Sequence, residues 1–317
     1  MNTGIWWATT TEHGEVFLYR NGALIYKRWS SGASVTFGAV PAFPYWNQRD
    51  HDIVDRPPRG QLRSVPMTDH SQMRLGKQPA RHDARTLLLA SYLTPHLPPA
   101  PSHVDWAAKV AGPWPLWKND ELGDCTACGA AHMIQTWTAN GSTEYAMPEA
   151  EVVNFYEDAC GYDPADPNTD QGGVLLDVLK YWRKAGCGGH KIGAFVAVPT
   201  TSKTLTMDGL WLFGGLYLGI ALPLSAQSQR VWDVPHGGAH GKGAPNTWGG
   251  HCVNVVAADA RGLTCVTWGA TKRLTWGFLR AYCDESYAIV SPDWVSGERA
   301  APSGFDLATL QADLAAL

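Results

Sequence analysis

The chain has 317 residues, of which 17% are charged, and a formal net charge of −4. This length is enough for one large domain or two modest ones, with a substantial buried core. Because 25 basic side chains face 29 acidic ones, no basic excess is present to neutralise a phosphate backbone, and the composition argues against nucleic-acid binding.

Targeting segments are not evident in the sequence. The N-terminus has no basic region followed by a long apolar run, so we expect no signal peptide. The most apolar run, Gly209–Leu224, contains four glycines and a proline within sixteen residues, which is short of the roughly 18–20 needed to cross a membrane. We interpret it as a buried strand with its approach and expect no membrane partner. The seven cysteines, an odd number, fit free thiols in a reducing compartment.

The first third of the chain is predicted to be β-rich and then irregular. Residues 15–19 and 23–29 flank Asn21-Gly22, a dipeptide that favours a hairpin because both turn positions need positive φ. Residues 39–80 carry many prolines, arginines and histidines without a period, which indicates a surface-hugging connector or arm.

A change in the sequence pattern near residue 104 marks the main predicted domain boundary. Before it, Ala84–Tyr92 is predicted to be a short helix and Thr94–Pro101, with four prolines, an extended linker. The chain is thereby divided into a hairpin-containing segment (1–38), an extended arm or linker (39–103), a main domain (104–295) and a tail with a short helix at Asp306–Leu317 (296–317).

In the main domain, helices come first and strands second. Asp124 is a suitable N-cap for a helix over Cys125–Ala139, and further helices are predicted at Pro148–Ala159 and Val174–Lys184. Apolar, β-branched runs predict strands at Leu216–Leu222, His251–Ala258, Leu263–Trp268 and Tyr287–Val290. This order predicts an α+β fold in which a helical half faces an antiparallel β half.

A cysteine and a histidine in this pattern form a candidate catalytic pair. Cys125 lies at the N-terminus of its predicted helix, where the helix dipole and free N–H groups favour the thiolate, the nucleophilic form. His251 begins a strand far downstream, after a Gly-rich loop. Either residue alone is more often a packed core residue, but their chain order is that of enzymes in which an imidazole takes the proton of a thiol.

Several short motifs give residues 104 to about 290 a resemblance to the papain-like cysteine peptidase superfamily. They are Val104-Asp105-Trp106, Gly123-Asp124-Cys125-Thr126-Ala127-Cys128, Gly172-Gly173, Gly250-His251-Cys252-Val253 and Val266-Thr267-Trp268-Gly269. The chain also resembles papain-like proteins encoded by actinobacterial phages and prophages, in which a Gly-Asp-Cys step and a late Thr-Trp-Gly recur. The resemblance implies a papain-like fold, a thiol hydrolase that acts on peptide or isopeptide bonds without a cofactor or metal, and a location in the bacterial host cytoplasm or the virion.

The resemblance leaves two cysteines in contention as the nucleophile. The sequence from Cys125 to Gly129 is similar to the family's Cys-Gly-Ser-Cys-Trp, which favours Cys128. The family's oxyanion-hole glutamine lies six residues before its nucleophile. That position is Leu122 for Cys128 but Asn119 for Cys125, and only asparagine can donate a hydrogen bond. We therefore prefer Cys125, with Asn119 and the Cys125 backbone N–H as the oxyanion hole, and keep Cys128 as the rival.

The residue that orients the imidazole departs from the Asn or Asp of the family. The aligned position is Val266, or Thr267 if the register shifts by one residue, and we assign the role to the Thr267 hydroxyl. Asp259 and Asp284 are alternatives only if the fold brings them close to His251.

A zinc site is a weaker alternative for the same helix. Cys125, Cys128 and His132 share one helical face, and His236 with His240 could complete a ligand set. Structural zinc sites usually take one cysteine pair from a turn and the remaining ligands from elsewhere, so we expect no metal.

Two functions therefore stay open. The first is a thiol hydrolase with a peptide or protein substrate as its partner. The second is a structural or interaction protein that keeps the papain-like fold without turnover, as a virion component in a homo- or hetero-oligomeric assembly. The low charge and the 15 tryptophans suit large buried contacts. The N-terminal hundred residues have the length of the family's propeptide but not its helical content, and they either occlude the cleft or attach the protein to a larger assembly.

Overall fold

The computed structural model describes residues 70–94 and 97–295, together with the backbone of four strands between residues 6 and 36. The chain forms two compact units, residues 1–66 and 67–317. Residues 67–103, which the sequence assigned to an arm, therefore fall within the second unit. The predicted terminal helix at Asp306–Leu317 lies outside the described residues.

The first unit contains a four-stranded antiparallel sheet. Its strands are β1 (Trp6–Thr10), β2 (Val16–Arg20), β3 (Ala23–Arg28) and β4 (Ser34–Thr36), in that spatial order. Strands β2 and β3 pair across the Asn21-Gly22 step, with Arg20 opposite Ala23. The antiparallel pairing agrees with the predicted hairpin.

The second unit combines helices with one mixed, mostly antiparallel sheet. The helices are α1 (Cys125–Gly141), α2 (Glu149–Cys160), α3 (Leu175–Lys184), α4 (Lys203–Phe213), α5 (Trp276–Tyr282) and α6 (Pro292–Val295). The strands are β5 (Val104–Asp105), β6 (Ala194–Ala197), β7 (Leu216–Leu222), β8 (Val231–Trp232), β9 (Gly249–Ala258), β10 (Gly262–Thr267), β11 (Ala270–Thr275) and β12 (Cys283–Val290).

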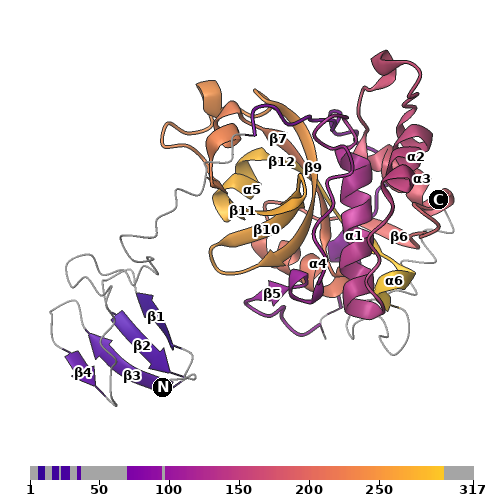
Figure 1. Ribbon diagram of the computed structural model, residues 1–317. Helices are drawn as coiled ribbons and strands as arrows, with labels where there is room; N and C mark the ends of the chain where they lie inside the picture. Colours follow the sequence, from indigo (N-terminus) through magenta and orange to yellow (C-terminus); the bar gives the residue numbers. More distant parts are fainter. Residues whose placement is uncertain are drawn as a thin grey trace. The chain divides into compact units, whose positions relative to one another are not determined.

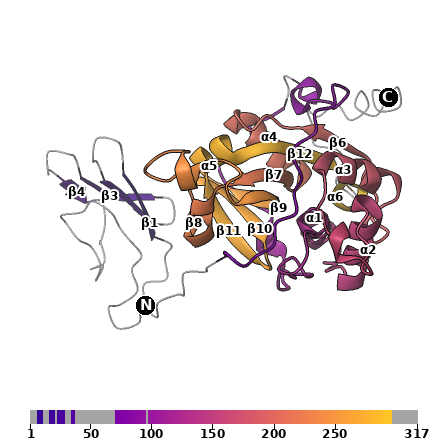
Figure 2. The same cartoon turned by 90° about the horizontal axis from the view of Figure 1, so that it is seen from above.

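The order of strands in this sheet is β6-β12-β7-β9-β10-β11-β8, and β5 also pairs with β9. Neighbours are antiparallel except β11 and β8, which are parallel. Figures 1 and 2 show α1, α2 and α3 gathered at one side of the unit, with β10 and β11 at the other. The predicted α+β architecture, a helical half against a largely antiparallel β half, is confirmed.

Helix α1 packs directly on the sheet because its side chains are small. A Cβ at Gly129 would lie 3.0 Å from Cε2 of Tyr217 and 3.1 Å from Sγ of Cys252, so a larger residue would require these side chains of β7 and β9 to shift. The Tyr217 hydroxyl donates a hydrogen bond of 2.7 Å to the carbonyl oxygen of Thr126, which fixes the first turn of α1 against β7. The start of α1 is thereby held next to the centre of the sheet.

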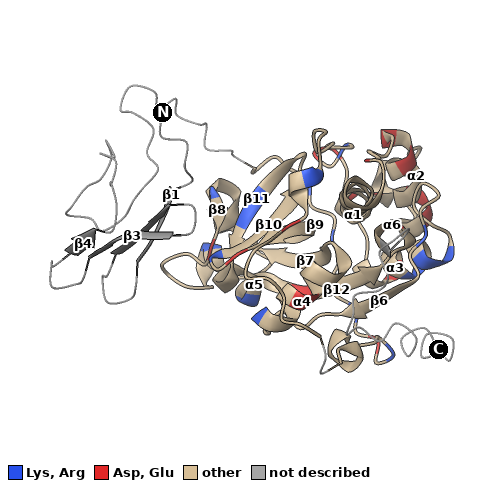
Figure 3. Ribbon diagram, turned by 90° about the horizontal axis from the view of Figure 1, so that it is seen from below, with Lys and Arg blue, Asp and Glu red and all other residues tan. Residues whose placement is uncertain are grey.

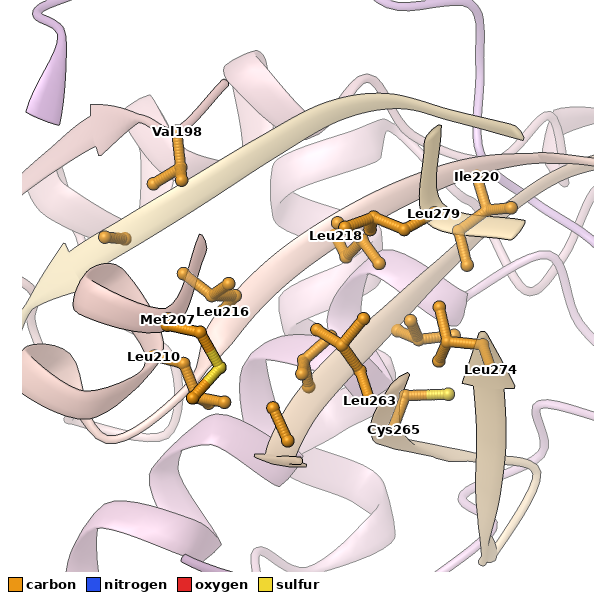
Figure 4. Packing of buried hydrophobic residues seen from close by; sticks show 14 of the residues in the cluster. Val198, Met207, Leu210, Leu216, Leu218, Ile220, Leu263, Cys265, Leu274 and Leu279 are labelled. Carbon is orange, nitrogen blue, oxygen red and sulfur yellow. The ribbon is translucent and has the colours of Figure 1, made fainter. Parts of the chain in front are cut away.

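A cluster of buried hydrophobic side chains fills the β half. Figure 4 shows side chains from β7, β10, β11, α4 and α5 meeting there, among them Leu218, Leu263 and Leu274. Strands β7 and β9 carry no Lys, Arg, Asp or Glu and are entirely tan in Figure 3, as expected for strands that are buried on both faces. The central strands therefore form a rigid support for any residue that they carry.

The structure corrects the interpretation of two segments. The predicted strand at Leu216–Leu222 is confirmed as β7, but its approach from Gly209 is the end of helix α4, which the sequence did not predict. Gly214, at φ +69°, ends the helix in the left-handed conformation that favours glycine. The predicted helix at Ala84–Tyr92 is reduced to a 3₁₀ helix at Leu89–Tyr92. Within the described part of the chain, no helix is both long and apolar enough to span a bilayer.

Candidate active site

Cys125 is the first residue of α1, and its sulfur lies where three segments meet. The backbone N–H of Cys252 in β9 donates to Sγ at 3.4 Å, and the backbone N–H of Gly76 lies near enough to the same sulfur to lower the pKa of the thiol. The side chain is buried, with 1% of its surface exposed. The sulfur is thus enclosed by the helix start, the histidine-bearing strand and residues near position 76.

His251 precedes Cys252 in β9, and its ring is held by one hydrogen bond and one stacking contact. Its Nε2 shares a hydrogen bond of 2.7 Å with Oγ1 of Thr267, the last residue of β10. The Trp268 ring stacks on the imidazole with centroids 4.4 Å apart. The other ring nitrogen, Nδ1, is buried and has no hydrogen-bond partner among the described residues.

The other predicted orienting residues are engaged elsewhere. Val266 is buried and lacks a polar group. Asp259 pairs with Arg273 at 2.9 Å, and Asp284 pairs with Lys77 at 2.8 Å. Among the candidates considered from the sequence, Thr267 is therefore the residue that the structure brings to the imidazole.

Asn119 lies close to the start of α1, but its amide is held by Asp124. Its Nδ2 donates a hydrogen bond of 2.9 Å to Oδ1 of Asp124, and both side chains are buried. Asp124 occupies the N-cap position as predicted, yet its side chain accepts no capping hydrogen bond from the helix. Burial raises the pKa of Asp124 to about 7, although the hydrogen bond from Asn119 opposes this shift.

Cys128, the rival nucleophile, lies one turn into α1. Its sulfur makes long contacts of 3.9 Å with the carbonyl oxygens of Leu116 and Trp117 and also lies close to the Asp124 carboxyl group. Burial raises the pKa of its thiol well above the ordinary value. His132, part of the zinc alternative, shares a hydrogen bond of 3.0 Å with the carbonyl of Pro115. Over the described residues, no group of three or more His, Cys, Asp or Glu side chains is placed to hold a metal ion.

The candidate pair is neutral in this structure. Burial raises the pKa of the Cys125 thiol to about 12, although N–H groups of Cys252 and Gly76 oppose the shift. Burial, followed by the nearby charge of His70, lowers the pKa of His251 to about 3. The thiolate expected from the helix position is therefore not the form present here, because desolvation outweighs the helix dipole.

A stretch of chain that we call the covering segment, residues 70–83, passes close to Cys125 at Gly76 and is drawn in violet in Figure 1. Its backbone forms hydrogen bonds with both halves of the unit. Gly173 N–H donates to the carbonyl of Gly76 at 2.8 Å, and Gln78 N–H donates to the carbonyl of Gly173 at 2.9 Å. Lys77 N–H donates to the carbonyl of Gly250, next to His251, at 3.0 Å. The segment thus bridges the predicted double glycine and the histidine strand.

Glycines make this close approach possible. A Cβ at Gly76 would lie 1.7 Å from the carbonyl oxygen of Gly123, and one at Gly172 would lie 1.8 Å from the carbonyl oxygen of Gly76. Real Cβ contacts of this kind begin near 3.0 Å. Any side chain at position 76 would therefore push the segment away from the sulfur.

Ion pairs hold the segment at both ends. Arg74 pairs with Asp170 at 2.9 Å, and Asp83 pairs with Lys180 at 3.0 Å. His70 stacks on Trp268 with ring centroids 5.0 Å apart. None of these contacts has a local signal in the sequence, since each joins residues far apart in the chain.

Comparison with known proteins gives a likeness at the level of structure only. No family model and no curated protein matches the sequence. The structure is similar to that of xylellain, a cysteine protease from Xylella fastidiosa, with a TM-score of 0.52 and 15% identity over 69% of this chain and 96% of that one. A further likeness, with a TM-score of 0.47 and 11% identity, is to the digestive procathepsin L 3 of Tenebrio molitor larval midgut, over 70% of this chain and 77% of that one. The chain has the fold of papain-like cysteine proteases.

Proposed function

We propose that this chain is a papain-like thiol hydrolase that cleaves peptide or isopeptide bonds, and that the structure is its latent form. The observation that carries the proposal is the placement of the Cys125 sulfur at a helix N-terminus beside β9, whose His251 imidazole is fixed by Thr267 at 2.7 Å. A nucleophile, a base and a group that orients the base are the three parts that covalent catalysis requires.

The chemistry follows from the two ring nitrogens of His251. With its proton on Nε2, the imidazole donates to the Thr267 hydroxyl and leaves Nδ1 as a free acceptor. After the covering segment leaves, Nδ1 takes the Cys125 proton and the thiolate attacks the substrate carbonyl. The imidazolium then protonates the leaving amine, and water releases the acyl group from the sulfur.

The negative oxygen formed during this attack needs donors. The Cys125 backbone N–H lies at the helix start, where N–H groups have no partner within the helix. Asn119 is the second donor that we propose, because an amide nitrogen carries two hydrogens and its hydrogen bond to Asp124 uses one. Asp124, held neutral below pH 7 by its burial, positions this amide without placing a negative charge beside the thiolate.

The biological context that we propose is a phage or prophage. The support is the resemblance of Gly123-Asp124-Cys125 and Thr267-Trp268-Gly269 to motifs of phage-encoded papain-like proteins. The enzyme would act in the bacterial host cytoplasm or within the virion on a peptide or protein, without nucleic acid or membrane as its partner.

A structural or interaction protein of the virion is the second candidate. It is favoured by the neutral Thr267 hydroxyl, which cannot stabilise an imidazolium as a carboxylate does, and by the engagement of Asn119 with Asp124. In this case the fold is kept for assembly, as a homo- or hetero-oligomer.

Peptide cleavage distinguishes the two candidates. A Gly76→Ala variant, whose covering segment is displaced, is incubated with a peptide mixture, and new termini are identified by mass spectrometry. The hydrolase predicts new termini that vanish in Gly76→Ala/Cys125→Ala and Gly76→Ala/His251→Ala but persist in Gly76→Ala/Cys128→Ala. Absence of cleavage by the Gly76→Ala protein, while its fold is retained, contradicts the hydrolase and favours the structural role.

A further inference from the structure

The covering segment inserts one lysine into an acidic pocket of the unit. The Lys77 side chain is 1% exposed, and its Nζ lies 2.8 Å from Oδ2 of Asp284 and 3.2 Å from Oε1 of Glu285. Burial alone lowers the pKa of Lys77, but the hydrogen bond to Asp284 and the attraction of both carboxylates outweigh it and leave the pKa raised. The lysine is therefore held as a cation in a nearly closed space.

A bulge in strand β12 creates the two-carboxylate wall. The pairing of β12 with β7 shifts between Cys283 and Glu285. Successive strand residues normally point to opposite faces, and a bulge changes that alternation. Asp284 and Glu285 can therefore both reach the same cation. Oε2 of Glu285 accepts a hydrogen bond of 3.0 Å from the Tyr287 hydroxyl, so the carboxylate is held by the domain and not by Lys77 alone.

The depth of the pocket depends on Gly219 in β7. A Cβ at this position would lie 2.3 Å from Cε of Lys77 and 2.6 Å from Cγ of Glu285, so the absence of a side chain makes room for the lysine stem. A cavity of about 640 Å³ borders Asp284 and Glu285. This cavity is open space beside the carboxylates, in which we expect the larger guanidinium of arginine to fit.

The pocket lies one residue away from the candidate nucleophile. The N–H of Gly76 lies near the Cys125 sulfur, and Lys77, the next residue, donates its N–H to the carbonyl of Gly250 beside His251. Consecutive Cα atoms are about 3.8 Å apart. A peptide that reaches the sulfur along this path therefore presents a side chain to Asp284 and Glu285.

Charge balance indicates what that side chain must be. Two carboxylates face one lysine, so the pocket is negative even when it is filled. When the covering segment leaves, Asp284 and Glu285 both lose their cation partner. An unpaired buried charge is unfavourable, and a ligand cation restores the pairing.

We infer that, once the covering segment is displaced, this pocket selects substrates with a lysine or arginine side chain next to the bond that is cleaved. The inference rests on the proposed function, since it names the substrate class of the same site. It makes Asp284 and Glu285 residues that determine specificity rather than mere anchors of the covering segment.

Binding and cleavage test the inference separately. Three synthetic peptides have the sequence of residues 74–79 and differ only at the position of Lys77. One keeps lysine, one has arginine, and one has norleucine, which is similarly long but uncharged. Their binding to full-length Gly76→Ala protein is measured by protection of Cys125 from iodoacetamide. We expect the lysine and arginine peptides to bind at least tenfold more tightly than the norleucine peptide. Glu285→Gln and Asp284→Asn, each added to Gly76→Ala, reduce this preference, whereas Asp177→Asn, which removes the partner of Arg81 outside the pocket, keeps it.

The outcomes separate the pocket from the reaction. Equal binding of the three peptides, or an equal loss for all three in Glu285→Gln, overturns the inference and leaves the pocket as an anchor of the covering segment. Should Glu285→Gln lower the unfolding temperature strongly, Asp284→Asn is the decisive variant, because the Asp284 side chain is 36% exposed. A fluorogenic peptide series with the same substitutions then reads out cleavage. Preferential binding of the lysine peptide without any cleavage contradicts the proposed hydrolase but supports the basic selectivity of the pocket. Cleavage without a preference for a basic side chain supports the hydrolase but overturns this selectivity.

Discussion

The substitution Gly76→Ala tests how the covering segment is held over Cys125. The added Cβ would lie 1.7 Å from the carbonyl oxygen of Gly123 and 2.2 Å from its carbon, where ordinary contacts begin near 3.4 Å. Both atoms belong to the backbone of Gly123, just before helix α1, so no side-chain rotation relieves the overlap. The segment must therefore move away from the sulfur.

The size of the effect follows from the contacts that are lost. Three backbone hydrogen bonds join Gly76, Lys77 and Gln78 to Gly173 and Gly250. At about 1 kcal/mol each, their loss weakens the closed state by about 3 kcal/mol, which is on the order of 100-fold in the ratio of closed to open protein. With a Cys125 pKa of about 12 and 1% exposure, the thiol reacts through the open form alone.

Alkylation of Cys125 by iodoacetamide at pH 7.5, followed by peptide mapping, measures this ratio. We expect labelling of the Gly76→Ala protein to be about 100-fold faster than that of the original chain. Gly237→Ala is the matched control, because a Cβ there meets no atom within 4 Å. Equal labelling rates for the original chain and Gly76→Ala, with both folded, refute the view that this close backbone fit keeps the thiol covered.

Three further predictions concern the buried polar groups of the site. Thr267→Val lowers the free energy of unfolding in urea by about 1–3 kcal/mol, because His251 Nε2 loses its partner; an unchanged value contradicts this role. Asp124 has a folded pKa of about 7, above its ordinary 3.8, so its stabilising contribution is lost as pH rises through 7. Asp124→Asn therefore gains stability relative to the original chain between pH 5 and pH 8, and a pH-independent difference argues against a neutral Asp124. His251 has a folded pKa of about 3, below its ordinary 6.5, so the unfolded state gains the proton first and stability falls as pH drops from 6.5 towards 3. His251→Gln flattens this dependence in urea titrations at each pH, whereas an equally steep loss in the variant assigns it to other groups.

The elements that carry the site could be predicted where a local signal was strong. Helix α1 was predicted to begin at Cys125 and does so, because the preceding polar residues and the run of small side chains indicate both its start and its burial. Strand β9 was predicted within two residues of its start, because its apolar, β-branched sequence follows a glycine-rich loop. Strand β7 was predicted with its bounds, Leu216–Leu222, but helix α4 (Lys203–Phe213) was not predicted, since its end lies in the apolar run Gly209–Leu224, which was interpreted as the approach to the strand.

The geometry of the site depended on information that the sequence does not hold locally. The choice between Val266 and Thr267 was a question of strand register, which the pairing of β9 with β10 decides through distant contacts. The engagement of Asn119 with Asp124 joins two side chains that precede α1, directly after left-handed backbone at Trp117 and Lys118. Neither feature leaves a periodic pattern.

The covering segment was the largest omission. The sequence allowed that the N-terminal hundred residues occlude the cleft, but it did not identify Gly76 or Lys77. Both lie in a stretch without period, and their partners are about 100 to 200 residues away. A short Leu-Gly-Lys step in an irregular region is too common to predict such a contact. Only the fold reveals that a glycine fits over the thiol and a lysine fits between two carboxylates.

The pH dependence of Cys125 alkylation in the opened Gly76→Ala protein tests the central claim most directly. If Cys125 and His251 form a catalytic pair, labelling stays fast below pH 7 and falls to the rate of an ordinary thiol, with a pKa near 8.5, when His251→Ala is added. A labelling rate that follows an ordinary thiol across the whole pH series, and that is the same with and without His251, contradicts the claim.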